Sequence, residues 1–188
     1  MSISARFTSA DLAWLPAMDG IRYEIIDGDL FVSKQPNWDH QYASDRVVRP
    51  LHDWNDLTGL GFAASTPGLV FADDDDVIPD VVWISRARLA EVRDAGGHLT
   101  AAPELVVEVL SPGRENARRD REIKLALYAR RGVREYRIVD WQLEAVDVYR
   151  RVADDLALVA TLTGADVLTT PLLPGFECPI AVLWMPAP

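Results

Sequence analysis

Apolar residues along the chain gather in short runs that are separated by turn residues. One of these runs, residues 105–110, contains five apolar side chains and a single carboxylate, Glu108. Pro103 precedes the run and Ser111-Pro112-Gly113 follows it, so it predicts a buried strand. Because side chains alternate across a strand, both faces of this strand are apolar, and we expect it to lie centrally in a sheet.

Other apolar runs predict further strands before and after this one. Two short runs flank Asp27-Gly28, a strong two-residue turn signal, and predict a hairpin over residues 23–32. The remaining strand patterns are found at residues 62–71, 77–84, 135–140, 145–152 and 156–163, with an irregular strand and turn at 172–184. Asp80 lies near the start of the strand predicted at 77–84.

Helical spacing of apolar residues appears in four places. The clearest pattern runs from about residue 38 to residue 57 and ends at Gly59-Leu60-Gly61. Three further helices are predicted at residues 10–15, 85–95 and 116–128, the first within an N-terminal arm of residues 1–20. In the last of these, Asp120, Lys124 and Tyr128 are spaced four residues apart and share one face. The other charged residues of this helix mostly occupy other faces and are expected to be solvated; they are Arg118, Arg119, Arg121, Glu122 and Arg130.

The order of these elements predicts an α/β (α+β) fold with a central, mostly antiparallel or mixed sheet and helices packed on it. The 188 residues show no repeat, no low-complexity linker and no break in composition, so we expect a single domain over residues 1–188. The acidic run at residues 73–76 is expected to be a solvated loop.

Composition narrows the classes of function. The formal net charge of −10 disfavours non-specific binding to a polyanion, although it leaves room for a local basic patch. A single cysteine, Cys178, excludes an internal disulfide framework and a cysteine-based zinc cluster. The chain has neither a secretory apolar segment nor a stretch long enough to span a membrane, so we expect a cytoplasmic protein that does not enter a membrane.

Glu108 is the residue whose surroundings most need an explanation. Burial of a carboxylate costs several kcal/mol of folding free energy unless a partner binds it. One candidate partner is Lys124, on the partly apolar face of the predicted helix. The other is a divalent metal shared with Asp80, for which oxygen ligands suit Mg²⁺ or Mn²⁺. From the residues alone, both candidates remain open, and so does a purely structural role in which an arginine or a backbone amide satisfies the carboxylate.

The pattern Pro79-Asp80, then Glu108 about thirty residues later, then a lysine on the next helix is similar to the PD-(D/E)XK nuclease superfamily. The usual Glu-x-Lys element of that superfamily would require lysine at position 110, where this chain has Leu110. Several phrases nevertheless resemble one branch, the restriction endonucleases of the Uma type, in which the lysine is thought to have moved to the following helix. These phrases are YEIIDGDL, PDVVWI, PELVVEVLSPG, GVREYRIVD and LLPGFE, and the resemblance covers roughly residues 20–180.

The resemblance implies a restriction-endonuclease-like sheet with additional antiparallel strands, and a metal-dependent endonuclease that hydrolyses DNA. Asp80 and Glu108 would bind Mg²⁺ or Mn²⁺, with the Val109 carbonyl as a third ligand. Lys124 would orient the attacking water or stabilise charge on the phosphate. Glu24 would assist the metal site. The family likeness also implies a homodimer.

Simpler roles stay open for the same side chains. Asp80 after a proline often bonds only backbone, and His40, next to Gln41, can be no more than a polar residue at a helix start. Tyr128 is expected in the core. The fold could also belong to a catalytically degenerate protein that binds or assembles without cutting. A nuclease needs an electropositive groove, for which the candidates are Arg114, Arg118, Arg119, Arg121, Arg130, Arg131 and Arg134.

Overall fold

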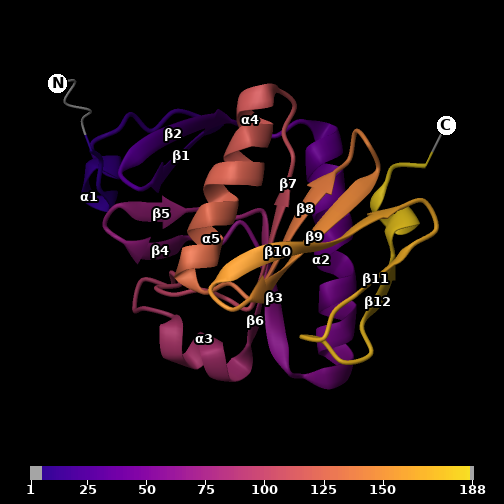
Figure 1. The fold of residues 1–188 in the computed structure, drawn as a ribbon. Helices are drawn as coiled ribbons and strands as arrows, with labels where there is room; N and C mark the ends of the chain where they lie inside the picture. The colour runs from indigo at the N-terminus through magenta and orange to yellow at the C-terminus, as the bar shows by residue number, and fades with distance from the viewer. Residues whose placement is uncertain (1–5, 187–188) are drawn as a thin grey trace.

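Two β-sheets form the centre of the computed structural model, which describes residues 6–186 (Figure 1). The larger sheet contains, in spatial order, β10 (Asp155–Thr163), β9 (Ala145–Val152), β8 (Glu135–Asp140), β7 (Leu105–Val109), β6 (Val81–Ser85) and β3 (Gly61–Ser65). The smaller sheet contains β2 (Asp29–Lys34), β1 (Ile21–Ile26), β5 (Asp75–Val77) and β4 (Leu69–Ala72). Residues 1–5 of the predicted N-terminal arm and residues 187–188 lie outside the described part.

The larger sheet is mixed, because β7 and β8 run parallel while its other neighbouring strands are antiparallel. A parallel pair needs a crossover connection, and here a long helix supplies it. This helix has three consecutive segments, α4 (Arg114–Arg118), the π-helical η1 (Arg119–Lys124) and α5 (Leu125–Arg131). The connection therefore brings the helix that carries Lys124 back over the strand that carries Glu108.

The remaining elements are mostly short. They are α1 (Ser9–Leu12), α2 (Trp38–Thr58), α3 (Arg86–Val92), the strand pair β11 (Val167–Thr169) and β12 (Glu177–Pro179), and the 3₁₀ helix η2 (Ile180–Leu183). None of the helices within residues 6–186 is both long enough and apolar enough to cross a bilayer.

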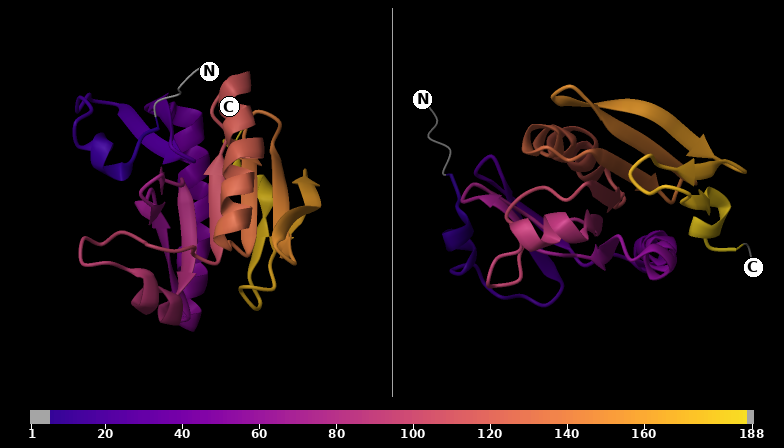
Figure 2. Two further views of the ribbon diagram at one scale, coloured as in Figure 1. Left: turned by 60° about the vertical axis from the view of Figure 1, so that its left-hand side comes forward. Right: turned by 90° about the horizontal axis from the view of Figure 1, so that it is seen from below.

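Helices cover both faces of the larger sheet, with α2 on one face and the long helix on the other (Figure 2). Val107 and Val109 of β7 belong to the core that includes Leu51 of α2. Val106 belongs to a second core, which contains Leu127 of α5 together with residues of the smaller sheet. The prediction that this strand is buried on both faces is confirmed, and so is the predicted fold class.

Local signals set the bounds of the elements near the N-terminus. Asp27 and Gly28 both have positive φ, 51° and 74°, as a two-residue hairpin turn requires, and they join β1 to β2. Asn37 caps α2 by accepting a hydrogen bond from the His40 amide, and Gly59 ends it with φ 65°. The hairpin and the long second helix are therefore where the sequence predicted them.

The acidic run is only in part the solvated loop that was predicted, because Asp73 and Asp74 form a turn while the rest of the run belongs to a strand. Asp75 is only 1% exposed and belongs to β5. Its carboxylate accepts hydrogen bonds from the Asp27 amide and from the guanidinium groups of Arg130 and Arg131 on α5. The prediction failed because these arginines lie 55 and 56 residues further along the chain.

The single strand predicted at residues 77–84 is also wrong, since it is divided between the two sheets. β5 ends at Val77 and β6 begins at Val81, with Pro79 in the link. Proline has no amide hydrogen to donate to a ladder, which favours a break at this position. Asp80 consequently lies just before β6, at the junction of the two sheets.

Candidate active site

Four charged side chains from distant parts of the chain line one small cavity between the two sheets and the long helix. They are Glu24 of β1, Asp80 before β6, Glu108 of β7 and Lys124 of η1. Each is at most 6% exposed. The cavity has a volume of about 30 Å³, which is enough to hold water.

Lys124 bridges two of the carboxylates. Its Nζ lies 2.8 Å from Oε1 of Glu24 and 3.0 Å from Oε1 of Glu108. The Glu24 oxygen also accepts a hydrogen bond of 3.0 Å from the Ile78 amide. An ammonium has three donors, so one N–H remains after these two contacts. The lysine on the following helix thus reaches the glutamate of the central strand, while its catalytic role stays a prediction.

The π-helical segment explains which side chains of the helix reach the cavity. In a π turn the hydrogen bond runs from residue i to i+5, so Arg119 and Lys124 lie on the same side. Arg119 lines the cavity and its side chain, 12% exposed, contacts Asp120 at 3.1 Å. The sequence-based expectation that Arg119 is solvated is wrong, because it assumed the angular spacing of a regular α-helix.

Tyr128, one turn beyond Lys124, also contacts the central glutamate. Its hydroxyl donates a hydrogen bond of 2.7 Å to Oε1 of Glu108, and the residue is fully buried. The prediction that Tyr128 belongs to the core is confirmed. The side chain in addition fixes the orientation of Glu108, since the same oxygen receives both Lys124 and Tyr128.

Asp80 is held by groups from three segments. Its Oδ2 accepts a hydrogen bond of 2.9 Å from the Val109 amide and lies 3.3 Å from Nε2 of His40. Its Oδ1 lies 3.5 Å from a guanidinium nitrogen of Arg22. The backbone contact matches the simpler interpretation of Asp80, but the carboxylate also lies beside Glu108 in the cavity.

Sequence reasoning placed too little weight on His40 and grouped it with Gln41. His40 is 5% exposed and lines the cavity, and its Nδ1 has no hydrogen-bond partner within residues 6–186. The Gln41 side chain is exposed and faces Asp45 of the same helix. The apolar positions at 43, 47 and 51 could have shown that His40 shares the buried face of α2.

Of the three carboxylic acids that line the cavity, Glu108 is the one whose pKa is raised. Burial, together with the negative charges of Asp80, Asp120 and Glu24, raises its pKa to about 8, although Lys124 opposes this shift. For Lys124, burial works against the charged form, but the surrounding carboxylates outweigh it and raise the pKa above its ordinary value. Lys124 is therefore charged at neutral pH, while Glu108 carries a proton in most of the molecules.

The other two carboxylates are ionised. Burial alone would raise the pKa of Glu24, but the contact with Lys124 reverses this effect and lowers it below the ordinary value. Burial also opposes ionisation of Asp80, whose pKa is nevertheless lowered by His40 and by the Val109 amide. The cavity therefore holds two ionised carboxylates, Glu24 and Asp80. The third acid, Glu108, has too little positive charge near it to offset burial and the neighbouring negative charges.

The donor set fits a hard divalent cation. Asp80 and Glu108 offer oxygen ligands only, and Glu108 would exchange its proton for a metal charge. In the described part of the chain, no three side chains of the His, Cys, Asp and Glu types come together around a possible ion position. The side chains that would hold such an ion are therefore the two carboxylates of Asp80 and Glu108.

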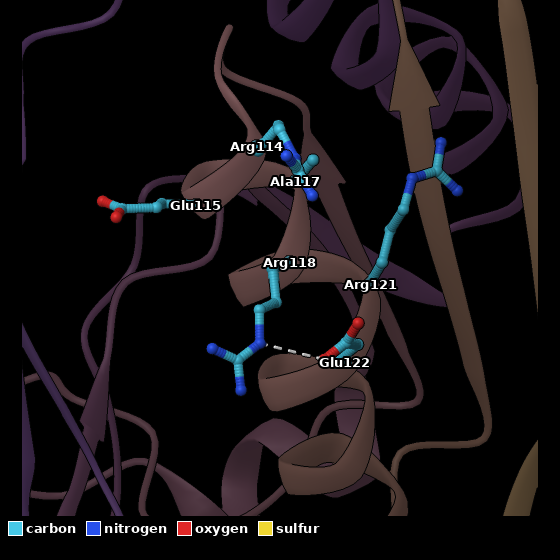
Figure 3. A pocket seen from close by; sticks show the side chains of 6 residues that line it. All are labelled: Arg114, Glu115, Ala117, Arg118, Arg121 and Glu122. Atoms are coloured by element: carbon cyan, nitrogen blue, oxygen red, sulfur yellow. Dashed lines mark hydrogen bonds and ion pairs between the residues drawn. The ribbon is translucent and has the colours of Figure 1, made fainter.

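Most of the candidate arginines do not line this cavity. Arg114, Arg118 and Arg121 line a separate hollow of about 570 Å³ on the outer side of the long helix (Figure 3). In Figure 3, Arg118 and Arg121 leave the helix in opposite directions, Arg118 toward Glu122 and Arg121 away from it. Arg121 contacts Asp140 and Asp147, and Arg130 and Arg131 bind Asp75.

Of the seven arginines proposed for a groove, Arg119 is the member that lines the carboxylate cavity. Arg22 and Lys34, which the sequence did not single out, line it as well. The positive charge at the site is therefore local and small, in keeping with the acidic net charge of the chain.

Comparison with known proteins identifies one matching family and one solved structure with the same fold. The family model Uma2, described as "Putative restriction endonuclease", matches residues 10–181. A crystal structure from Anabaena variabilis ATCC 29413, described as a "putative nuclease belonging to DUF820", superposes with a TM-score of 0.73. It is 17% identical in sequence, with 94% of this chain and 97% of that chain covered, which shows a shared fold.

Other comparisons add little. The type IIG restriction endonuclease BpuSI is 12% identical over 77% of this chain and 14% of its own, with a TM-score of 0.41. At that score the likeness does not bear on fold or function. No curated protein matches the chain.

Proposed function

The chain belongs to the Uma2 family, whose model matches nearly its whole length, and on that basis we propose that it is a metal-dependent endonuclease that hydrolyses phosphodiester bonds of DNA. The observation that carries the proposal is the meeting of Asp80, Glu108 and Lys124 in one buried cavity. These are the three residue types that a nuclease of this kind requires, and they come from segments far apart in the sequence.

We assign Mg²⁺ or Mn²⁺ to the carboxylates of Asp80 and Glu108, with the Val109 carbonyl as a third ligand. When bound, the ion would polarise the scissile phosphate and lower the pKa of a water molecule that it holds. Lys124 and Tyr128 both contact Oε1 of Glu108. We therefore assign the second oxygen of Glu108 to the cation.

The protein's own groups would prepare the site for the substrate. Glu24 and Glu108 hold the Lys124 ammonium in place, and its third N–H would donate to a phosphate oxygen or to the attacking water. His40 and the Val109 amide would keep the Asp80 carboxylate in position. Because the groups are fixed before the substrate arrives, little reorganisation would be needed during the reaction.

A second candidate is a catalytically degenerate protein that keeps the nuclease fold for binding or assembly. It is favoured by the double contact of Lys124, which satisfies Glu24 and Glu108 without any further ligand. Both candidates share the fold and the family, and they differ in whether the cavity takes up a metal and cuts.

Cleavage of DNA in Mg²⁺ or Mn²⁺, measured both as nicking of supercoiled plasmid and as cutting of a single-stranded circle, separates the two candidates. Wild type should cut. Glu108→Gln keeps the shape of the side chain but loses its charge, so its rate of cutting should be lower than that of wild type by about a hundredfold or more. Gln41→Ala, at an exposed position on α2, should cut like wild type. Equal cutting by wild type and Glu108→Gln would reject the nuclease assignment, and no metal-dependent cutting by wild type would favour the degenerate protein.

The homodimer and the cytoplasmic location implied by the sequence remain proposals. The family likeness supports the homodimer, which sedimentation equilibrium would test as a mass about twice the 20.9 kDa of the chain. A mass near that of one chain, measured at micromolar protein concentration, would reject the homodimer.

A further inference from the structure

We propose that the site takes a single strand of nucleic acid, which lies along β2 in a groove between that strand and the long helix. The inference rests on the proposed nuclease function, because it names the kind of substrate that the same site would accept. It is carried by the shape of the surface next to the cavity, by the number of positive side chains there and by the burial of the carboxylates.

The first observation is a second hollow beside the carboxylate cavity. This hollow has a volume of about 260 Å³ and is walled by Phe31-Val32 of β2 and by Arg118 and Arg119 of the long helix. The carboxylate cavity is lined by the next residues of the strand, Ser33-Lys34, and again by Arg119. Because consecutive residues of one strand and the same arginine line both spaces, we infer one groove that runs along β2 to Glu108.

The second observation is the small number of cations in this groove. Arg22, Lys34 and Arg119 lie at its inner end, together with Lys124, which is paired with two carboxylates. Arg118 lies at its outer end, where Glu115 also lines the hollow. Arg118 pairs with Glu122, but its side chain is 70% exposed, so a phosphate could replace that partner at little cost. Proteins that bind duplex DNA commonly neutralise about 6–10 phosphates, whereas about three or four cations suit a short stretch of one strand.

The third observation is the depth of the site. Asp80 and Glu108 are 6% and 2% exposed, and the space beside them has a volume of only about 30 Å³. The phosphates of a duplex lie on the surface of a stiff cylinder, while a single strand can bend one phosphate into a narrow opening. Phe31 and the 57% exposed Val32 give the groove an apolar wall against which a base or sugar could lie.

Binding without cleavage tests this inference. Fluorescence anisotropy would compare a labelled twelve-nucleotide single strand with the matching duplex, using the wild-type protein in EDTA over a series of salt concentrations. We expect tighter binding of the single strand, with a slope of log K against log salt of about −2, which corresponds to roughly three phosphates. Arg118→Ala should weaken binding and make that slope less steep by about 0.7.

Arg49→Ala is the matched control. Arg49 is also an exposed helix arginine, 72% exposed in its side chain, with an acidic partner four residues away, but it lies on α2 and lines neither space of the groove. Arg49→Ala should bind like wild type. The proposal is overturned if the duplex binds as tightly as the single strand, if neither binds, or if Arg49→Ala and Arg118→Ala weaken binding equally.

The plasmid assay separates this test from the test of the proposed function. If wild type and Glu108→Gln nick equally, the nuclease assignment falls, and the anisotropy result still decides whether the groove holds a single strand. If Glu108→Gln is inactive but binding favours the duplex, the nuclease assignment stands and the groove is rejected.

Discussion

The Nζ of Lys124 lies 3.0 Å from Oε1 of Glu108, with both side chains buried, although the residues are sixteen positions apart. The same ammonium contacts Glu24, so a single cation joins the smaller sheet, the larger sheet and the long helix. Breaking a buried ion pair by removing one partner is strongly destabilising, because the other charge is left without compensation. The pair is therefore accessible to stability measurements as well as to activity assays.

Lys124→Met should lower the free energy of unfolding at pH 7 by about 3 kcal/mol, measured by urea denaturation. This is the lower end of the range for a broken buried pair. Glu108, whose pKa is already raised to about 8, can become neutral by binding a proton, so that mainly Glu24 is left as an unpaired charge.

The double variant Lys124→Met, Glu108→Gln controls for the loss of packing. It should be more stable than the sum of the two single variants predicts, since removal of both partners leaves fewer unpaired charges. Additive effects, or a loss below about 1 kcal/mol for Lys124→Met, would show that the ion pair contributes little.

Mg²⁺ should raise the melting temperature of the wild-type protein if Asp80 and Glu108 hold the ion. At a concentration one hundred times the dissociation constant, the stabilisation is about 2.7 kcal/mol, or roughly 5–10 °C for a chain of this size. Differential scanning calorimetry of Asp80→Asn should show no such rise. Asp45→Asn, at an exposed position on α2, should keep it, and an equal rise in Asp80→Asn would exclude Asp80 as a ligand.

His40→Ala should weaken Mg²⁺ affinity about 10–100-fold, because His40 supports the carboxylate of a proposed ligand. Calorimetric titration of the folded protein would measure the affinity. Gln41→Ala is the neighbouring control and should leave the affinity unchanged, since its exposed side chain donates a hydrogen bond to Asp45 of the same helix. If the two variants behave alike, His40 has no role in holding Asp80.

Asp75 should make the protein sensitive to acid. Burial alone would raise the pKa of Asp75, but the Asp27 amide and the guanidinium groups of Arg131 and Arg130 lower it below the ordinary value. A carboxyl with a lowered pKa stabilises the fold above its unfolded pKa of about 4 and loses that contribution as the pH falls further. Asp75→Asn should therefore flatten the acid side of a plot of unfolding free energy against pH.

The same variant should cost about 3 kcal/mol at pH 7, the lower end for a broken buried pair, because Arg130 and Arg131 are about one third exposed. Asp74→Asn is the matched control, since Asp74 is the preceding residue and its side chain is 47% exposed. An unchanged acid limb in Asp75→Asn, or an equal change in Asp74→Asn, would contradict this account.

The strand around Glu108 could be predicted because its signal is local. An apolar run with a carboxylate inside it, between turn residues, already implies a buried strand and a buried partner. The sequence offered Lys124, a metal, or an arginine or backbone amide as that partner, and the structure brings Lys124 to Glu108. The side-chain alternation further assigned Val106 and Val107 to opposite faces, as the two cores show.

Other features depend on contacts that no local pattern records. Asp75 resembles its solvated neighbours in sequence, and only its distant arginine partners make it a buried residue. His40 is a lone histidine without a second ligand at a recognisable spacing, so its contact with Asp80 could not be inferred. Arg119 was misplaced because the π turn, which changes the direction of every following side chain, has no clear sequence signal.

The arrangement of the charged side chains across both sheets has a consequence for synthesis of the protein. Glu24, Asp80 and Glu108 leave the ribosome before Lys124, and the parallel partner of the Glu108 strand follows only at residues 135–140. A nascent chain that ends before Lys124 holds the three acids without the cation that joins them. The proposed catalytic centre can therefore form only after most of the polypeptide has been made, and under the proposed function an unfinished chain would be unable to cut nucleic acid.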